Sequence, residues 1–288
     1  MTVRRSAAVR DGFQYLEGAR WHDGALWFSD IPQGKVYRMS PEGELDVVAS
    51  GQPHPSGLGF APDGTVLVVG MENRELLRIQ ADGSSEKAAD LSEVSFSPND
   101  MWVDSTGRAY ISQLGYDVFG GAEPQGTHVL VADPDGSVST AGTGLVCPNG
   151  IGLTPDGRTL IVVESFAQRI SAFAVDSQGR LSDQRVFAQF EQTEANVMDG
   201  LCVDSAGAVW VACPFAGEVR RILDGGEITD RVKVETDGHM AIACALGGPD
   251  LRTLYVCAAD ITFEQMADDF NGKARIEAAT VDIPGMAH

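Results

Sequence analysis

Six similar segments of this sequence are each preceded by a residue at an equivalent place. The six residues are Glu17, Ser56, Asn99, Asn149, Asp199 and Met240. Four of them carry carboxylate or amide oxygens, and two carboxylates meeting at one point would repel one another and cost several kcal/mol in desolvation unless a cation neutralised them. Hard oxygen donors without His or Cys favour Ca²⁺, Mg²⁺ or Mn²⁺ over a dedicated zinc site, although Zn²⁺ could also bind.

Each of these residues, taken alone, has a simpler interpretation as a turn residue. Asn-Gly and Asp-Gly are common turn dipeptides, and an Asn side chain can bond to the nearby backbone. Asn149 and Asp199 are both followed by glycine. Oxygen donors at four of six equivalent places favour a shared site over four independent turns.

The segments that must position these residues share an apolar run, a turn with Gly, and a β-branched or aromatic run. They span residues 18–30, 57–70, 100–113, 150–164, 200–213 and 241–258. The first five turn glycines are spaced by 40, 43, 50 and 50 residues, close to the period of propeller repeats. Further strand-like pieces follow each turn, so the pattern predicts an all-β, six-bladed β-propeller with four antiparallel strands per blade.

The predicted propeller occupies residues 1–288 as a single domain. In such a ring the innermost strand of each blade lines the central channel, so residues at the starts of these strands converge on the axis. We expect the N-terminal residues 4–13 and the C-terminal residues 275–285 to share the last blade, and a helical turn within residues 263–270. A β-sandwich or an ordinary barrel is the alternative fold.

Charge and hydropathy limit the classes of partner. The 288 residues include 21 Lys and Arg against 41 Asp and Glu, a formal net charge of −20, which argues against nucleic-acid binding. No run approaches the roughly 20 apolar residues of a membrane helix, and the first residues lack the apolar core of a signal peptide. Five cysteines without a C-x-x-C pair are typical of a reducing compartment. We therefore expect a cytoplasmic protein without a membrane partner.

Four motifs in this order resemble the SMP-30/gluconolactonase/luciferin-regenerating-enzyme family. They are "YLEGARWHDGALWFSDIPQGKVYR", "SPNDMWVDSTGRAYIS", "CPNGIGLTPDGRTLIVVES" and "MDGLCVDSAGAVWVAC". The resemblance covers nearly the whole chain and implies a six-bladed propeller with one catalytic divalent metal near the axis, which hydrolyses lactones, typically those of sugar acids.

The resemblance also implies roles for individual residues. Glu17, Asn149 and Asp199 match the family's metal ligands. Asn99 matches a residue that contacts the substrate or a metal-bound water, and that ligates the metal in related propeller hydrolases. Ser97 stands where sugar-lactone members commonly carry an Arg. Loss of the bidentate guanidinium contact favours a less polar lactone.

Lactone hydrolysis needs a polarised carbonyl, an activated water and a proton for the ring alkoxide. A metal supplies the first two, and Asp199 is the best candidate for the general base, with Glu17 as the alternative. Asn99 is the second predicted catalytic residue. The chain contains no G-x-S-x-G motif, so a serine-triad hydrolase has no support.

Loops that follow the second strand of each repeat should line the substrate pocket. The predicted substrate-binding residues are Ser97, Asn99, Tyr116, Phe119, Phe166 and Phe215, with Ile31, Met71 and Phe263 as further wall candidates. We expect a small-molecule lactone as substrate. An organophosphate or aryl-ester hydrolase of the same propeller type, and a non-catalytic calcium-binding propeller, are the alternative functions.

Overall fold

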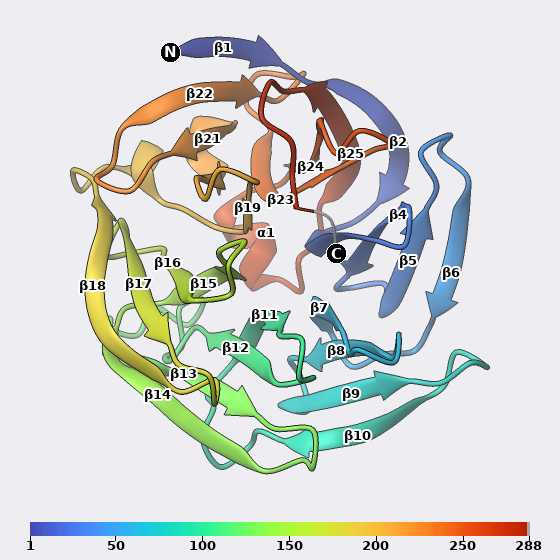
Figure 1. Ribbon diagram of the computed structural model, residues 1–288. Helices are drawn as coiled ribbons and strands as arrows, with labels where there is room; N and C mark the ends of the chain where they lie inside the picture. Colours follow the sequence, from blue (N-terminus) through green and yellow to red (C-terminus); the bar gives the residue numbers. More distant parts are fainter. Residues whose placement is uncertain (287–288) are drawn as a thin grey trace.

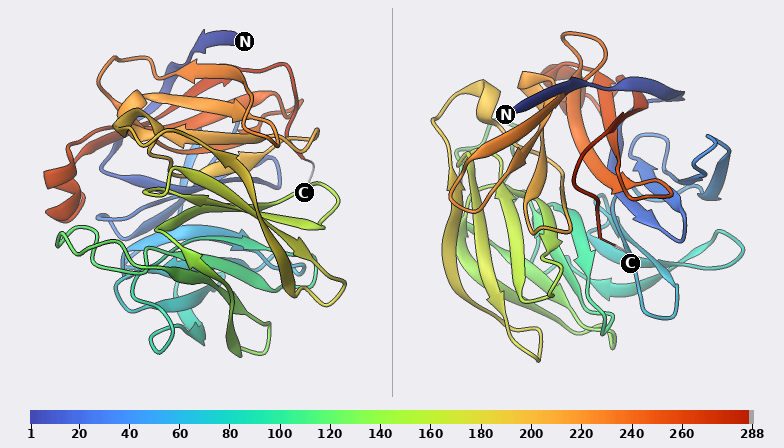
Figure 2. Two further views of the ribbon diagram at one scale, coloured as in Figure 1. Left: turned by 90° about the vertical axis from the view of Figure 1, so that its left-hand side faces the viewer. Right: turned by 45° about the horizontal axis from the view of Figure 1, so that its top comes forward.

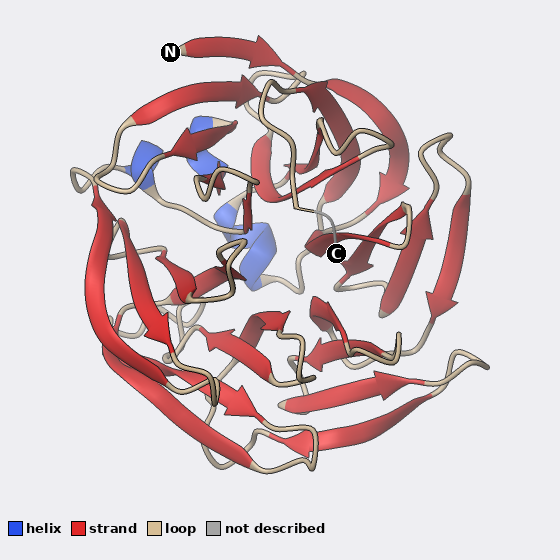
Figure 3. Ribbon diagram, viewed as in Figure 1, coloured by secondary structure: helices blue, strands red, loops and turns tan. Residues whose placement is uncertain are grey.

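Six β-sheets are arranged around a central axis like the blades of a propeller (Figure 1). The computed structural model describes residues 1–286. Each sheet contains four strands that pair antiparallel with their neighbours, and one sheet has a fifth, parallel strand. Helical residues are few and lie in connections between strands (Figure 3). The predicted six-bladed, all-β fold is confirmed.

The first five blades follow one another along the chain. Blade one consists of β3 (Leu16–His22), β4 (Ala25–Asp30), β5 (Lys35–Met39) and β6 (Leu45–Ala49). Blade two consists of β7 (Pro55–Phe60), β8 (Val66–Gly70), β9 (Glu75–Ile79) and β10 (Ser85–Asp90). Blade three consists of β11 (Pro98–Val103), β12 (Ala109–Gln113), β13 (Thr127–Ala132) and β14 (Val138–Leu145).

Blades four to six complete the ring. Blade four consists of β15 (Pro148–Leu153), β16 (Thr159–Glu164), β17 (Arg169–Val175) and β18 (Leu181–Gln189). Blade five consists of β19 (Leu201–Val203), β20 (Val209–Cys213), β21 (Glu218–Ile222) and β22 (Ile228–Lys233). Blade six consists of β23 (Met240–Gly247), β24 (Thr253–Asp260), β25 (Lys273–Thr280) and β2 (Ala7–Phe13).

The two ends of the chain meet in blade six, as predicted. Strand β2 pairs antiparallel with β25 and supplies the outermost strand of that blade. The preceding strand β1 (Thr2–Arg5) was not predicted: it runs parallel to β22 at the outer edge of blade five, where Arg4 pairs with Asp230 at 2.9 Å. The N-terminal segment therefore ties blade five to blade six.

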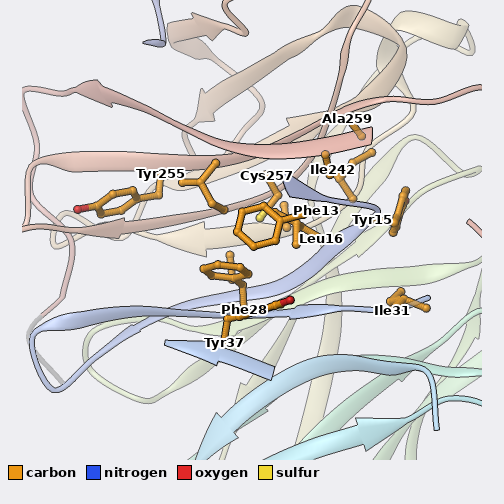
Figure 4. Close-up of a cluster of buried hydrophobic side chains, with 14 of the residues drawn as sticks. Phe13, Tyr15, Leu16, Phe28, Ile31, Tyr37, Ile242, Tyr255, Cys257 and Ala259 are labelled. Atoms are coloured by element: carbon orange, nitrogen blue, oxygen red, sulfur yellow. The ribbon is translucent and has the colours of Figure 1, made fainter. Parts of the chain in front are cut away.

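A buried hydrophobic cluster joins blade six to blade one (Figure 4). Phe13, at the end of β2, packs edge-on against Phe28 and Tyr37 of blade one, with ring centroids 5.3 Å apart in both pairs. Ile242 and Cys257 of blade six belong to the same cluster. Burial of these apolar side chains between blade six and blade one stabilises the closed ring.

The first strands of the blades form the wall of the channel. Each of β3, β7, β11, β15, β19 and β23 contacts the first strand of the next blade, and β23 contacts β3. The short helix α1 (Phe263–Ala267) projects from one face of the ring (Figure 2). It lies within the predicted helical turn and begins with a capping box between Thr262 and Gln265. No helix among residues 1–286 is long and apolar enough to cross a membrane.

Candidate active site

Three of the four predicted oxygen donors lie at places where the pairing between strands is interrupted. The register of β3 with β4 shifts between Glu17 and Arg20, and equivalent shifts follow Pro98 in β11 and Pro148 in β15. Asn99 and Asn149 lie inside the latter two. An irregularity of this kind re-aims a side chain and is common beside active sites.

Asp199 reaches the same level of the channel by a different local structure. It precedes β19, and its backbone N–H donates to the carbonyl of Ala212 at 2.9 Å. The Asp199 carbonyl in turn accepts a hydrogen bond from the N–H of Gly150 at 3.3 Å. These bonds fix Asp199 to its own blade and to blade four.

Close approach of neighbouring backbones explains why glycine follows Asn149. A Cβ atom added to Gly150 would lie 2.5 Å from the backbone nitrogen of Leu201 and 2.6 Å from the carbonyl oxygen of Asp199. Gly18, after Glu17, has a φ of +61° and would place its Cβ against the backbone of Ser56. Donor-glycine pairs therefore mark places where adjacent inner strands touch, not simple turns.

The four predicted donors line one pocket at the channel mouth. Glu17, Asn99, Asn149 and Asp199 are each less than a tenth exposed, and they share a cavity of about 80 Å³. Asn149 Oδ1 and Asp199 Oδ1 are buried without a hydrogen-bond partner. An unpaired buried oxygen is costly, so two of them facing one cavity fit a bound cation.

Only two of the four predicted donors are acidic, and this composition limits which ions would fit the pocket. Within residues 1–286 no group of three or more His, Cys, Asp and Glu side chains is arranged to hold a metal. The pocket instead combines two carboxylates with two amides. Such neutral and charged oxygens suit Ca²⁺, Mg²⁺ or Mn²⁺.

Burial and nearby negative charge raise the pKa values of both carboxylates. Burial raises the pKa of Asp199 to about 7; a hydrogen bond from Asn149 lowers it, and the charge of Asp100 adds to the rise. Burial also raises the pKa of Glu17 well above its usual value, with further contributions from Asp199 and Asp100. Without a cation, these carboxylates hold protons that exposed carboxylates would release.

Asp100 and Arg20 form a buried ion pair below the donors, which sequence analysis missed. Arg20 Nη2 lies 2.7 Å from Asp100 Oδ1, and it also donates to the carbonyl of Met101 at 2.5 Å. The sequence does contain a sign of this pair: Asp100 follows Asn99 at a place where four other repeats have glycine, namely Gly18, Gly57, Gly150 and Gly200. Among the six equivalent places only this one carries a charged side chain, and its carboxylate pairs with Arg20.

A hydrogen bond orients Asn99. Ser56 Oγ donates to Asn99 Oδ1 at 3.0 Å, and both side chains are buried. Ser56 is the residue of blade two at the equivalent place, so this blade supports a donor of its neighbour. With Oδ1 held in this way, the amide NH₂ group is the part of Asn99 that can donate to a substrate oxygen.

Most of the chain matches one known protein family. Residues 16–260 match the model of the SMP-30/Gluconolactonase/LRE-like region. The chain belongs to this family. All four donors lie inside the matched region.

Two relatives of this chain are named as lactonases. The pentonolactonase XacC of Haloferax volcanii is 30% identical over 269 residues, which cover 90% of this chain and 86% of that protein. The 6-deoxy-6-sulfogluconolactonase of Pseudomonas putida is 24% identical over 91% of this chain and 89% of that protein. Among solved structures, a calcium-binding regucalcin from Agrobacterium tumefaciens superposes with a TM-score of 0.82 at 22% identity, covering 99% and 97% of the two chains.

Every blade of this family member contributes to the pocket through the loop after its second strand. Of the wall residues predicted from the sequence, six line the pocket: Ile31, Met71, Phe119, Phe166, Phe215 and Phe263. Tyr116 lies one layer back, in a buried cluster with Leu114 and Cys147. Ser97 is not among the lining residues, and its carbonyl accepts a hydrogen bond from Leu114.

Sequence analysis missed ten lining residues, six in the same loops and four just before a first strand. They are Tyr15, Leu114, Val118, Cys147, Ser165, Val197, Met198, Pro214, Met266 and Phe270. Burial and the charge of Asp199 raise the pKa of the Cys147 thiol to about 12, so it stays protonated near neutral pH and is a poor nucleophile. The lining contains no His, Lys or Arg, and the available base is a carboxylate.

A larger hollow of about 1210 Å³ opens on the opposite face of the propeller. It is lined by turns between first and second strands, such as residues 61–64 and 153–157, and none of the four donors reaches it. Arg20 lines this hollow and pairs with Asp100 near the donors, so the ion pair separates it from the donor pocket. The donors therefore face only the smaller pocket.

Proposed function

We propose that this protein is a divalent-metal-dependent lactonase, a hydrolase that opens a small cyclic ester. The observation that carries this proposal is the pair of buried, unpartnered oxygens of Asn149 and Asp199, which face the same cavity as Glu17 and Asn99. The two relatives named as lactonases support the reaction class, and the regucalcin described as calcium-binding supports a cation of the Ca²⁺ type.

The four donors would hold the cation, which supplies a polarised lactone carbonyl and a water of lowered pKa. Asp199 is the proposed general base: one oxygen of its carboxylate would hold the cation, and the other would accept the proton of the attacking water. Glu17, whose Oε2 accepts a hydrogen bond from the N–H of Gly18 at 3.1 Å, is the alternative base.

The remaining steps use the same side chains. The amide of Asn99 donates a hydrogen bond to the carbonyl oxygen as negative charge develops on it. The ester C–O bond of the ring then breaks, and the departing alkoxide takes the proton that Asp199 had removed from water. The product is a hydroxy acid, and Asp199 returns to its starting state.

The proposal is tested by proton release from a panel of lactones. Protein stripped by a chelator is assayed, then reloaded with Ca²⁺, Mg²⁺, Mn²⁺ or Zn²⁺. We expect hydrolysis only after reloading. Paraoxon and phenyl acetate are assayed beside the lactones, and a preference for either would replace the lactonase with an organophosphate or aryl-ester hydrolase.

A binding protein without catalysis is separated by two measurements. Ca²⁺ binding by calorimetry together with no turnover of any substrate would favour it. Asp199→Asn should lower the turnover of a lactonase by about a hundredfold or more, whereas Asp224→Asn, at an exposed carboxylate paired with Arg185, should leave it unchanged. We also propose that the protein acts in the cytoplasm, because all five of its cysteines are free thiols.

A further inference from the structure

The walls of the donor pocket are almost entirely apolar above the level of the oxygen donors. Apart from the four donors, the polar lining side chains are Tyr15, Cys147 and Ser165. Two of these lie near the donors: the charges of Asp199 and Glu17 contribute to the raised pKa of Tyr15, and Ser165 Oγ is buried without a hydrogen-bond partner beside Cys147. The upper walls therefore offer almost no partner to a polar substituent.

An aromatic roof spans the pocket between blades three and six. Phe119 follows β12, and its ring lies 5.7 Å from that of Phe263 and, edge-on, 5.5 Å from that of Phe270. Phe270 in turn lies 4.9 Å from Tyr15. Phe263 and Phe270 belong to the loop that contains α1. Contacts between rings thus join two loops that are far apart in the chain.

Two phenylalanines at the pocket remain open to solvent. Phe215 is 42% exposed and Phe263 is 36% exposed. Large apolar side chains gathered at the edge of a pocket are typical of a binding surface, because exposing them to water without a ligand is unfavourable. Their position extends the apolar wall to the mouth of the pocket.

We propose that the substrate is a lactone with an apolar body, an alkyl-substituted or benzo-fused cyclic ester, and that Phe119 is a specificity-determining residue. This inference rests on the lactonase reaction proposed above. The ester group meets the oxygen donors at the base, and the apolar body lies against Phe119, Phe166 and Phe263.

The same walls select against sugar-acid lactones. A polyhydroxylated ring would bury several hydroxyl groups, and each hydroxyl left without a partner lowers kcat/KM by roughly tenfold or more. No Lys, Arg, His or Gln side chain lines the pocket to accept or donate such bonds. Removal of apolar surface from water has the opposite effect and favours the alkyl or benzo-fused ring.

The first experiment compares kcat/KM for δ-decalactone, dihydrocoumarin and glucono-δ-lactone with metal-reloaded protein. We expect the two apolar lactones to be preferred by at least a hundredfold. Efficient hydrolysis of gluconolactone with equal or poorer turnover of the apolar lactones would overturn the substrate class and leave the lactonase standing.

The variant Phe119→Ala tests the contact between the aromatic side chains over the pocket and the apolar body of the substrate. It should lower kcat/KM roughly tenfold for δ-decalactone, because it removes contact with the alkyl chain, and change δ-valerolactone, which lacks that chain, less than twofold. Phe96→Ala is the matched control: Phe96 is 53% exposed and does not line the pocket. Equal losses on both lactones, or an equal loss in the control, would contradict the assigned role.

A binding measurement separates the two proposals. Lactams resist hydrolysis, so calorimetry can compare the binding of an alkyl-substituted δ-lactam with that of gluconolactam. If no lactone is hydrolysed with any cation but the alkyl lactam binds at least tenfold more tightly, the reaction is wrong and the apolar preference stands. If gluconolactam binds as tightly as the alkyl lactam, the apolar preference is wrong.

Discussion

Replacement of Arg20 by Met should strongly destabilise the protein, because it leaves Asp100 as an uncompensated buried charge. The Asp100 side chain is 3% exposed. Besides Arg20, it accepts a hydrogen bond from the Met101 N–H at 2.9 Å and a longer one from Ile151 at 3.4 Å. These neutral donors do not replace a guanidinium.

The expected magnitude follows from the burial of the pair. Removal of one partner from a buried ion pair costs about 3–5 kcal/mol, since the remaining charge stays desolvated. Arg185 and Asp224 provide a matched control, with a similar contact of 2.6 Å but side chains that are 49% and 54% exposed. For Arg185→Met we expect a loss of about 0–1 kcal/mol in the free energy of unfolding.

Urea-induced unfolding followed by tryptophan fluorescence measures both variants. A chelator is present throughout, so that changes in metal binding do not contribute. Arg20→Met with Asp100→Asn should recover much of the lost stability, because the buried charge is then removed. If Arg20→Met costs no more than Arg185→Met, burial of the pair is not the source of its effect, and the reasoning is refuted.

Three further predictions concern the donors. Asp199→Asn should lower kcat about 10²–10⁴-fold if it is the general base, with Asp224→Asn close to wild type in the same pH-stat assay. Because the pKa of Asp199 rises to about 7 on folding, the free energy of unfolding of the metal-free protein should fall as pH increases from about 4 to 7. Asp199→Asn should reduce this dependence on pH in denaturation curves. An unchanged dependence would contradict the raised pKa of Asp199. Gly150→Ala should lower the free energy of unfolding by about 3 kcal/mol and weaken Ca²⁺ binding in calorimetry. Gly24→Ala is the control: its added Cβ meets no atom within 4 Å, so only its positive φ should matter, at about 1–2 kcal/mol.

The blade architecture could be predicted because its signals are local and repeated. Alternating apolar residues and turn glycines recur at nearly constant spacing, and each repeat specifies one antiparallel sheet. The sharing of blade six by residues near both chain ends was also predicted, and the pairing of β2 with β25 confirms it. The parallel strand β1 carries no such signal: its register with β22 depends on a surface edge that only the folded ring creates.

The meeting of the four oxygen-bearing side chains in one pocket could be predicted for the same reason, but their surroundings could not. Glu17 and Asn149 stand at the same place in the repeat, so symmetry alone brings them together. Arg20 and Asp100 pair across 80 residues from different positions of two repeats, and nothing in either repeat specifies the other. Phe270 reaches the pocket through the irregular loop after α1, where no periodic pattern constrains the chain.

The buried charges around the donors give a physical reason to expect a divalent cation. The charged groups that act on Glu17 are Asp199, Asp100 and Arg20. When all are ionised, Glu17, Asp199 and Asp100 carry three negative charges and Arg20 carries one positive charge. An excess of two negative charges remains. A monovalent cation would balance only half of that excess. Arg20 lowers the pKa of Glu17 directly, and its ion pair also neutralises Asp100, so that the charge left at Glu17 and Asp199 equals that of one divalent ion.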